Sequence, residues 1–126
     1  MIFHYCNVCG QVVVLPKHDD KGISCCETPM TLLEPNTTLL ADPNEHHIEL
    51  RQIGYFITVS VPNHPVMDVH HIEFIAIETN QGFQLKTIEN NQELIARFIL
   101  AKDEVIEKVY AFCNIHLLLF SESSRV

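Results

Sequence analysis

The chain has 126 residues, 47% of them hydrophobic, and a formal net charge of −8 with only eight lysines and arginines. This length allows one ordinary domain, or a small module followed by a compact domain. The few, scattered basic residues argue against binding to a nucleic-acid backbone. No apolar run approaches the roughly 20 residues that span a bilayer, so no membrane partner is expected. The N-terminus "MIFHYCNVCG" lacks the basic and apolar regions of a signal peptide, so we expect a cytoplasmic protein.

The first 33 residues hold four of the five cysteines. Cys6 and Cys9 form a C-x2-C motif followed by Gly10, and Cys25 and Cys26 are adjacent. Two thiolates on one tight turn can bind a tetrahedral ion, and glycine lets the backbone curl around the sulfur atoms. In a reducing compartment, clustered cysteines bind metal more often than they form disulfides. We therefore predict a four-sulfur metal site, and the sulfur donors alone fit either zinc or iron.

Two other interpretations of these cysteines stay open. They could be four unrelated thiols, or Cys6 and Cys9 could form a redox-active pair of the thioredoxin type. A thioredoxin-type pair is followed by a helix, whereas the residues after Cys9, "GQVVVLP", do not look helical. The metal site is therefore the preferred interpretation.

The rest of the chain predicts a linker followed by β-strands. Residues 34–44, "EPNTTLLADPN", contain two prolines and several turn formers, as linkers do. Segments rich in Ile, Val, Phe and Thr then follow, separated by turn-like pieces. They are "IELRQIGYFITVSV", "IEFIAIET", "GFQLKTI", "LIARFIL" and "VIEKVYAFCNIHLLLF".

Residues 90–108 contain Glu, Leu, Ala and Lys, which are also common in helices. We predict strand–turn–strand here, because the flanking segments are β and "ARFIL" shows no stripe of period 3.6. Antiparallel strands joined by short turns, without helical crossovers, indicate a β-sandwich. The predicted fold class is therefore all-β.

The histidines suggest a second metal site. A single histidine in a β-protein is most often a surface residue or a satisfied core residue. However, His64 and His70 bracket a loop that ends at a strand, and Cys113 and His116 span one tight turn. His70 and His71 are neighbours in a predicted strand and point to opposite faces, so only one should reach a shared site. A cysteine with several histidines suits a transition metal.

Residues 1–35 resemble the desulforedoxin module. The resemblance rests on "CNVCGQVV", a spacing of fifteen residues between Cys9 and Cys25, the adjacent cysteines, and the tail "PMTLL". It implies a rubredoxin-like iron centre with four cysteine ligands, in which zinc can replace iron. The implied ligands are Cys6, Cys9, Cys25 and Cys26.

The second part of the chain resembles the iron domain of superoxide reductases, the neelaredoxin or desulfoferrodoxin family. The matching motifs are Glu45-His46-His47, His64-Pro65 with His70 six residues on, "HIEFI" after it, and Cys113-Asn114-Ile115-His116. The resemblance implies one mononuclear iron with four equatorial histidines and an axial thiolate. These ligands are His47, His64, His70, His116 and Cys113.

Together the two resemblances imply the two-iron desulfoferrodoxin arrangement, with two irons per chain. Residues 1–36 would be the desulforedoxin-like four-cysteine module and residues 37–126 an immunoglobulin-like antiparallel β-sandwich. The family also implies a homodimer. The implied activity is superoxide reductase, in which an external donor such as a rubredoxin-type protein supplies the electron that converts superoxide to hydrogen peroxide.

Two residues outside the ligand set carry implied catalytic roles. The family's equivalent of Glu45 binds the open iron position in the ferric state. His46 stands where the family usually has a lysine that draws in the anion, and a histidine with a pKa near 6.5 is only partly charged at neutral pH. This departure keeps open a non-catalytic, iron-binding electron-transfer protein. A zinc-stabilised β-domain without a redox role is a third interpretation, which a five-ligand set disfavours because structural zinc sites close with four ligands.

Overall fold

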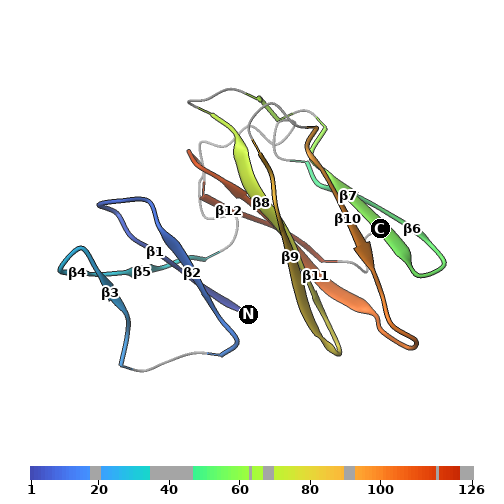
Figure 1. The fold of residues 1–126 in the computed structure, drawn as a ribbon, viewed down its shortest axis with the longest axis horizontal. Helices are drawn as coiled ribbons and strands as arrows, with labels where there is room; N and C mark the ends of the chain where they lie inside the picture. The colour runs from blue at the N-terminus through green and yellow to red at the C-terminus, as the bar shows by residue number, and fades with distance from the viewer. Residues whose placement is uncertain are drawn as a thin grey trace. The chain divides into compact units, whose positions relative to one another are not determined.

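The computed structural model describes residues 1–17, 21–34, 47–62, 64–66, 70–89, 93–115 and 117–122 (Figure 1). Within these ranges every regular element is a β-strand, which confirms the predicted all-β class. Among the same residues no helix is long and apolar enough to cross a membrane. The strands are β1 (Ile2–Tyr5), β2 (Val12–Leu15), β3 (Ser24–Cys25), β4 (Thr28–Pro29), β5 (Thr31–Leu32), β6 (Glu49–Ile53), β7 (Phe56–Ser60), β8 (Ile72–Thr79), β9 (Gly82–Thr87), β10 (Ile95–Ile99), β11 (Ile106–Cys113) and β12 (Leu117–Glu122).

The chain divides into two compact units, Met1–Glu34 and Pro35–Val126. The predicted boundary between residues 36 and 37 falls within 35–46, a stretch outside the described residues. We refer to the two parts as unit 1 and unit 2.

Unit 1 consists of a three-stranded antiparallel sheet and a short hairpin. The sheet has the order β2-β1-β5, and β3 pairs with β4. The β-branched run at residues 12–14 suits β2, because branched side chains pack well on a pleated surface. Among the described residues of this unit, the buried apolar side chains are few: Phe3, Cys6, Met30 and Leu33. A unit this small buries little apolar surface, and domains of this size usually need an additional source of stability.

Unit 2 is an antiparallel sandwich of two sheets, ordered β10-β7-β6 and β12-β11-β8-β9. Buried and more exposed residues alternate along β7 and β10, as strands with one face on a core require. One continuous core contains side chains from both sheets, among them Val59, Phe98, Ile75 and Val109. The chain changes sheet between β7 and β8 and between β9 and β10, as in immunoglobulin-like folds. The predicted sandwich is therefore confirmed.

Two of the quoted β segments are hairpins: residues 48–61, for which no turn was predicted, and residues 105–120, for which a tight turn was predicted between Cys113 and His116. Residues 48–61 form β6 and β7, joined by a two-residue turn in which Gly54 adopts φ 61°. Glycine at the first turn position is typical of a type II′ hairpin, whose twist matches that of the strands. Residues 105–120 likewise divide into β11 and β12, which pair Cys113 with Leu117. The strand–turn–strand prediction for 90–108 is confirmed by β10 and β11.

Candidate metal centres

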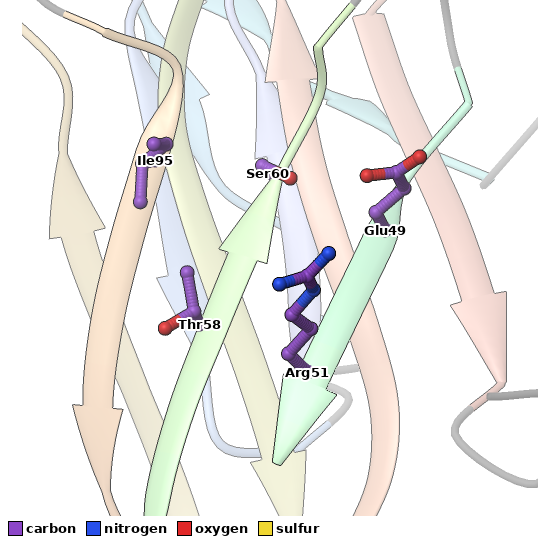
Figure 2. A pocket seen from close by; sticks show the side chains of 5 residues that line it. All are labelled: Glu49, Arg51, Thr58, Ser60 and Ile95. Carbon is purple, nitrogen blue, oxygen red and sulfur yellow. The ribbon is translucent and has the colours of Figure 1, made fainter. Parts of the chain in front are cut away.

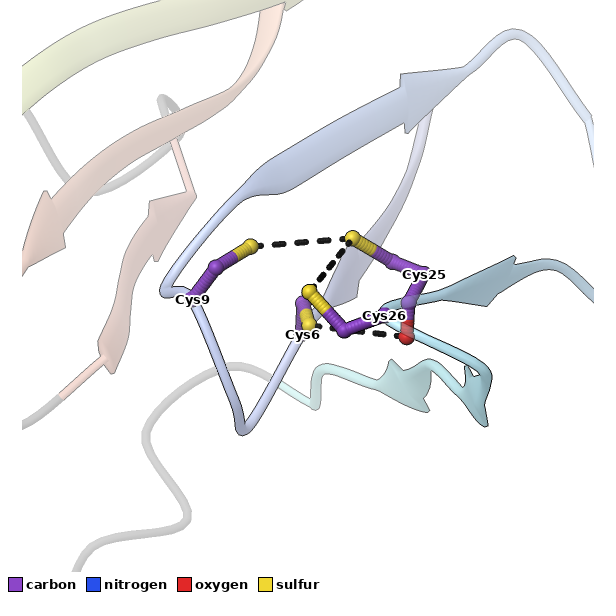
Figure 3. Close-up of side chains that lie close together, drawn as sticks. All are labelled: Cys6, Cys9, Cys25 and Cys26. Atoms are coloured by element: carbon purple, nitrogen blue, oxygen red, sulfur yellow. Dashed lines mark hydrogen bonds between the residues drawn. The ribbon is translucent and has the colours of Figure 1, made fainter.

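The four cysteines of unit 1 lie together (Figure 3), with all four Sγ atoms within 4.8 Å of one another. Cys9 Sγ lies 3.6 Å from Cys25 Sγ, and Cys25 Sγ lies 3.8 Å from Cys26 Sγ. All four are free thiols. The structure thus forms one cluster from two separate pairs.

The first pair lies on the loop between β1 and β2. The N–H of Gly10 donates to the carbonyl of Cys6 at 2.9 Å, and the N–H of Cys6 donates to the carbonyl of Gln11 at 2.9 Å. Gly10 adopts φ 80°, a left-handed conformation that glycine takes at little cost. The Asn7 side chain ties this loop to β5 by donating to Thr31 Oγ1 at 2.7 Å.

The second pair lies on the hairpin of β3 and β4. Cys25 pairs with Thr28, which leaves Cys26 and Glu27 as a two-residue turn. Both adopt positive φ, 52° and 60°, as in a type I′ turn. Residues with a Cβ lose about 1–2 kcal/mol each in this conformation. Such strain persists where other interactions hold it, often at functional sites.

The thiols of this cluster differ in acidity. Hydrogen bonding from the backbone N–H of Cys9, and then of Val8, lowers the pKa of the Cys6 thiol to about 6. Side-chain hydrogen bonding with Cys6, and then with Cys9, raises the pKa of Cys25 to about 12. Four adjacent thiols cannot all ionise at neutral pH without a cation to offset their charge. The donor set therefore fits a thiolate-binding metal such as zinc or iron.

A second group lies in unit 2, where the ligand atoms of His64, His70 and Cys113 are within 4.8 Å of one another. His64 Nε2 lies 3.1 Å from Cys113 Sγ, and the His64 and His70 rings meet edge to face with centroids 4.6 Å apart. Cys113 is fully buried and His64 is 4% exposed. His70 is half-buried and the other two residues are buried, so a charged metal bound there would interact strongly with its ligands.

The orientation of the His64 ring is fixed by a contact of Nδ1, the ring nitrogen that does not face Cys113. Its Nδ1 lies 2.9 Å from the carbonyl oxygen of Pro65. A carbonyl can only accept, so Nδ1 carries the proton and the lone pair is on Nε2, toward Cys113. Metal-binding histidines characteristically donate their second N–H to a carbonyl in this way. This arrangement, together with the thiol, fits a transition metal.

No family model matches the chain. It is 30% identical over 119 residues to a desulfoferrodoxin homolog of Archaeoglobus fulgidus, covering 92% of each chain. The chain belongs to the desulfoferrodoxin family. Its fold matches the superoxide reductase of Treponema pallidum, with a TM-score of 0.79, 20% identity, and coverage of 95% of this chain and 98% of that one. A superoxide reductase of Giardia intestinalis matches with a TM-score of 0.51 and 22% identity, over 62% of this chain and 97% of that one.

The remaining residues that the family resemblance implies are not all in the described ranges. Glu45, His46 and His116 lie outside the described residues. His47 is described, and its side chain is 60% exposed with Nε2 4.0 Å from Glu49 Oε1. It is not among the three residues that the structure brings together, so its role as a ligand stays a prediction.

Of the neighbouring histidines, only His70 has a ring nitrogen in the group. The His71 ring instead lies beside Glu73, with Nε2 3.6 Å from Oε1. This agrees with the alternation expected of adjacent residues in an extended segment.

Sequence reasoning assigned no role to the Pro65 carbonyl or to Asn114, although both lie within the quoted motifs. The Asn114 side chain accepts a hydrogen bond from the backbone N–H of His71 at 2.8 Å. The sequence does carry a signal for Asn114, namely an asparagine directly after a predicted strand. Asparagine side chains at such positions often hydrogen-bond to nearby backbone groups.

Proposed function

We propose that the chain is a superoxide reductase that converts superoxide to hydrogen peroxide at a mononuclear iron in unit 2. The observation that carries this proposal is the group formed by His64, His70 and Cys113, two of them buried, in a chain of the desulfoferrodoxin family. The proposed ligand set adds His47 and His116 to these three. An iron centre with four cysteine ligands, with zinc as a substitute, is proposed for unit 1.

The proposed reaction combines superoxide, one electron and two protons to give hydrogen peroxide, with no oxygen released. Iron, when bound, supplies the electron, and an external donor such as a rubredoxin-type protein restores it. Cys113 provides an electron-rich thiolate in a buried environment. His64 presents its Nε2 lone pair because the Pro65 carbonyl holds the proton on Nδ1.

Glu45 and His46 are proposed to act at the open side of the iron. Glu45 would occupy the position where superoxide binds and leave it for the substrate. His46 would attract the anion when protonated, and would do so more strongly as pH falls toward 6.5. Because His46 replaces the lysine that the family usually has, it also supports the alternative function, a non-catalytic electron-transfer protein that keeps both irons.

Measuring the products of the superoxide reaction separates these functions. The iron-loaded protein, mixed with superoxide and a reductant, should yield one hydrogen peroxide per superoxide and no oxygen. Iron that cycles between redox states without speeding superoxide loss would favour the electron-transfer alternative. Absence of any thiolate-to-iron absorption band in the purified protein would favour the zinc-only interpretation.

The proposed location is the cytoplasm, because none of the five cysteines is in a disulfide and a reducing compartment keeps thiols in that state. The proposed domain boundary stays at residues 36 and 37.

The homodimer is also a proposal, and the sheet β10-β7-β6 offers a surface for it. Ile53 pairs with Phe56, and Phe56 pairs with Ile99, so the three form one row across the sheet. They are 78%, 65% and 65% exposed, respectively. A two-fold axis through Phe56 would place this row on its own copy, as an isologous interface requires. The occupant that we propose is a second copy of the chain, because the family resemblance implies a homodimer.

The neighbouring residues on this sheet form a hollow of about 250 Å³ (Figure 2). Its lining residues, Glu49, Arg51, Thr58, Ser60 and Ile95, belong to neither metal group. An interface on this sheet would therefore bury the apolar row without using a metal ligand.

Sedimentation measurements on Phe56→Lys test the dimer. The parent should sediment as a dimer and Phe56→Lys as a monomer, because the charge disrupts the apolar row. Phe83→Lys, at a 46% exposed position on the other sheet, should remain dimeric. A monomeric parent, or a dimeric Phe56→Lys variant, would contradict the proposal.

A further inference from the structure

The ladder between β8 and β11 has the same construction at both ends. These are the two longest strands described, eight residues each, and they pair antiparallel in the middle of the four-stranded sheet (Figure 1). The register shifts near each end, between Ile106 and Lys108 and between Phe112 and Cys113. Beyond each shift an asparagine continues the pairing.

At the end that carries the His/Cys group, the asparagine is Asn114. Its backbone N–H donates to the carbonyl of His71 at 3.1 Å, and its side-chain Oδ1 accepts from the N–H of His71 at 2.8 Å. In a regular antiparallel ladder both bonds would use backbone carbonyls. Here the amide oxygen replaces the backbone carbonyl of Asn114, so the chain can turn toward β12 while His71 stays paired.

At the other end, the asparagine is Asn80. Its backbone N–H donates to the carbonyl of Val105 at 3.1 Å, and its Oδ1 accepts from the N–H of Val105 at 2.8 Å. The geometry equals that of Asn114 and His71. This end holds none of the three residues of the His/Cys group.

We propose that Asn114 is a positioning residue that holds His70 and Cys113 at metal-binding distance, a role that rests on the proposed function of unit 2. Asn114 directly follows Cys113, and His71 directly follows His70. Two hydrogen bonds between Asn114 and His71 therefore join the two ligand-bearing segments one residue away from each ligand. Asn80 performs the same structural task where there is no ligand to position.

The chemistry of the site explains why this joint is needed. A metal site requires its ligands within about 0.5 Å of their productive positions. The register shift between Phe112 and Cys113 interrupts the ladder just before the thiol. Without the Asn114 side chain, the His71 N–H would lose its acceptor, and the His70 segment could move relative to Cys113. The pairing of Cys113 with Ile72 and the backbone bond from the Asn114 N–H would remain, but the His71 N–H would no longer be held by the Asn114 side chain.

Cobalt binding tests the proposal without superoxide. Co²⁺ replaces iron in sites of this donor type, and a thiolate-to-cobalt absorption band reports the bond to Cys113. We expect Asn114→Ala to weaken cobalt binding at this site about 10–100-fold, the usual effect of losing a group that orients a ligand. Asn114→Asp keeps an acceptor oxygen at the same reach and should recover most of the affinity. The four-cysteine site serves as an internal reference and should be unchanged.

Asn80→Ala is the matched control, because it removes the equivalent side-chain acceptor at the other end of the same ladder, together with the bond from Asn80 Nδ2 to the Asp103 carbonyl. It should lower the stability of unit 2 at least as much as Asn114→Ala does, and leave cobalt affinity unchanged. Amide hydrogen exchange of the metal-free protein adds a second measurement. The His71 amide should exchange faster in Asn114→Ala than in the parent, and slowly again in Asn114→Asp.

Two results would overturn the inference. One is unchanged cobalt binding in Asn114→Ala, and the other is an equal loss of affinity in Asn80→Ala, which would show a general stability effect. Failure of the proposed function gives a different pattern. A parent that binds cobalt tightly and depends on Asn114, yet does not reduce superoxide when loaded with iron, would refute the activity and leave the positioning role intact.

Discussion

The two candidate metal groups are assembled in opposite ways. The cysteines of unit 1 come from two tight turns, with Cys6 and Cys25 only 19 residues apart. In unit 2, His64 and Cys113 meet although they are 49 residues apart. Local turn geometry forms the first group, whereas pairing between strands forms the second.

The surroundings of the two groups differ as well. Cys9 and Cys26 are exposed, whereas Cys113 and His64 are buried. Unit 1 has a small core, and its turn at Cys26 and Glu27 has two residues in the left-handed region. Unit 2 has a continuous core that spans two sheets. We infer that unit 1 needs its metal in order to fold, whereas unit 2 is folded before its metal binds.

The largest expected effect comes from Cys113→Ser. Serine fits the same space but supplies no thiolate, so superoxide reduction should fall by more than about 100-fold, beyond the effect of losing an orienting group. Rapid mixing with superoxide measures this rate. Cys9→Ser, which changes a thiol in the other group, should keep most of the direct reaction. A Cys113→Ser variant as fast as the parent would show that this thiol is not a ligand.

The second prediction tests whether the two units bind metal and fold independently. Replacing Cys9 and Cys26 by serine should remove the metal of unit 1 and, with it, the ordered structure of that unit. Amide exchange should then become fast at Val13 and Val14 of β2, and stay slow at Ile75 and Val109 in the core of unit 2. Loss of metal from both units in this variant would mean that the two groups are not independent.

A smaller effect is expected from Glu27→Gly. Glycine adopts the positive φ of this turn without a Cβ penalty, which should stabilise the folded unit. The greater conformational freedom of glycine in the unfolded chain offsets part of this gain. We expect unit 1 to gain about 0.5–1 kcal/mol in metal-loaded stability, measured as resistance to a chelator. Glu27→Ala removes the same carboxylate but keeps a Cβ, so it should give no such gain. Equal behaviour of the two variants would show that the turn is not strained at this position.

The smallest effect concerns acid stability of unit 2 at Glu104. A hydrogen bond from the Thr79 hydroxyl, and then one from the Ala101 N–H, lowers the pKa of this carboxyl below 4.5. A lowered folded-state pKa contributes stability at pH above 4.5, and this contribution is lost as pH falls through the lowered value. The urea midpoint of unit 2, followed from about pH 7 to 3, should therefore fall less in Glu104→Gln than in the parent. If the urea midpoints of the two proteins fell in parallel as the pH was lowered, Glu104 would not contribute to the loss of stability in acid.

Much of unit 1 could be predicted from sequence because its information is local. The spacing of Cys6, Cys9, Cys25 and Cys26 indicated one cluster, and turn geometry alone brings the two members of each pair together. The strand–turn–strand pattern of 90–108 was also predictable, because the flanking segments are β and "ARFIL" lacks the 3.6-residue stripe of a helix. The hairpin at Gly54 was missed, since the flanking residues are β-formers without a break other than one glycine.

For unit 2, the sequence by itself determined the all-β class and, through resemblance, the family and its candidate ligands. Only the tertiary structure decided that His64, His70 and Cys113 meet, because strand pairing sets which distant residues become neighbours. It also decided which nitrogen of His64 carries the proton, through a carbonyl that the residue types alone do not orient. The role of Asn114 likewise depends on the register between β8 and β11. Register is a property of two strands together, and neither strand's sequence specifies it alone.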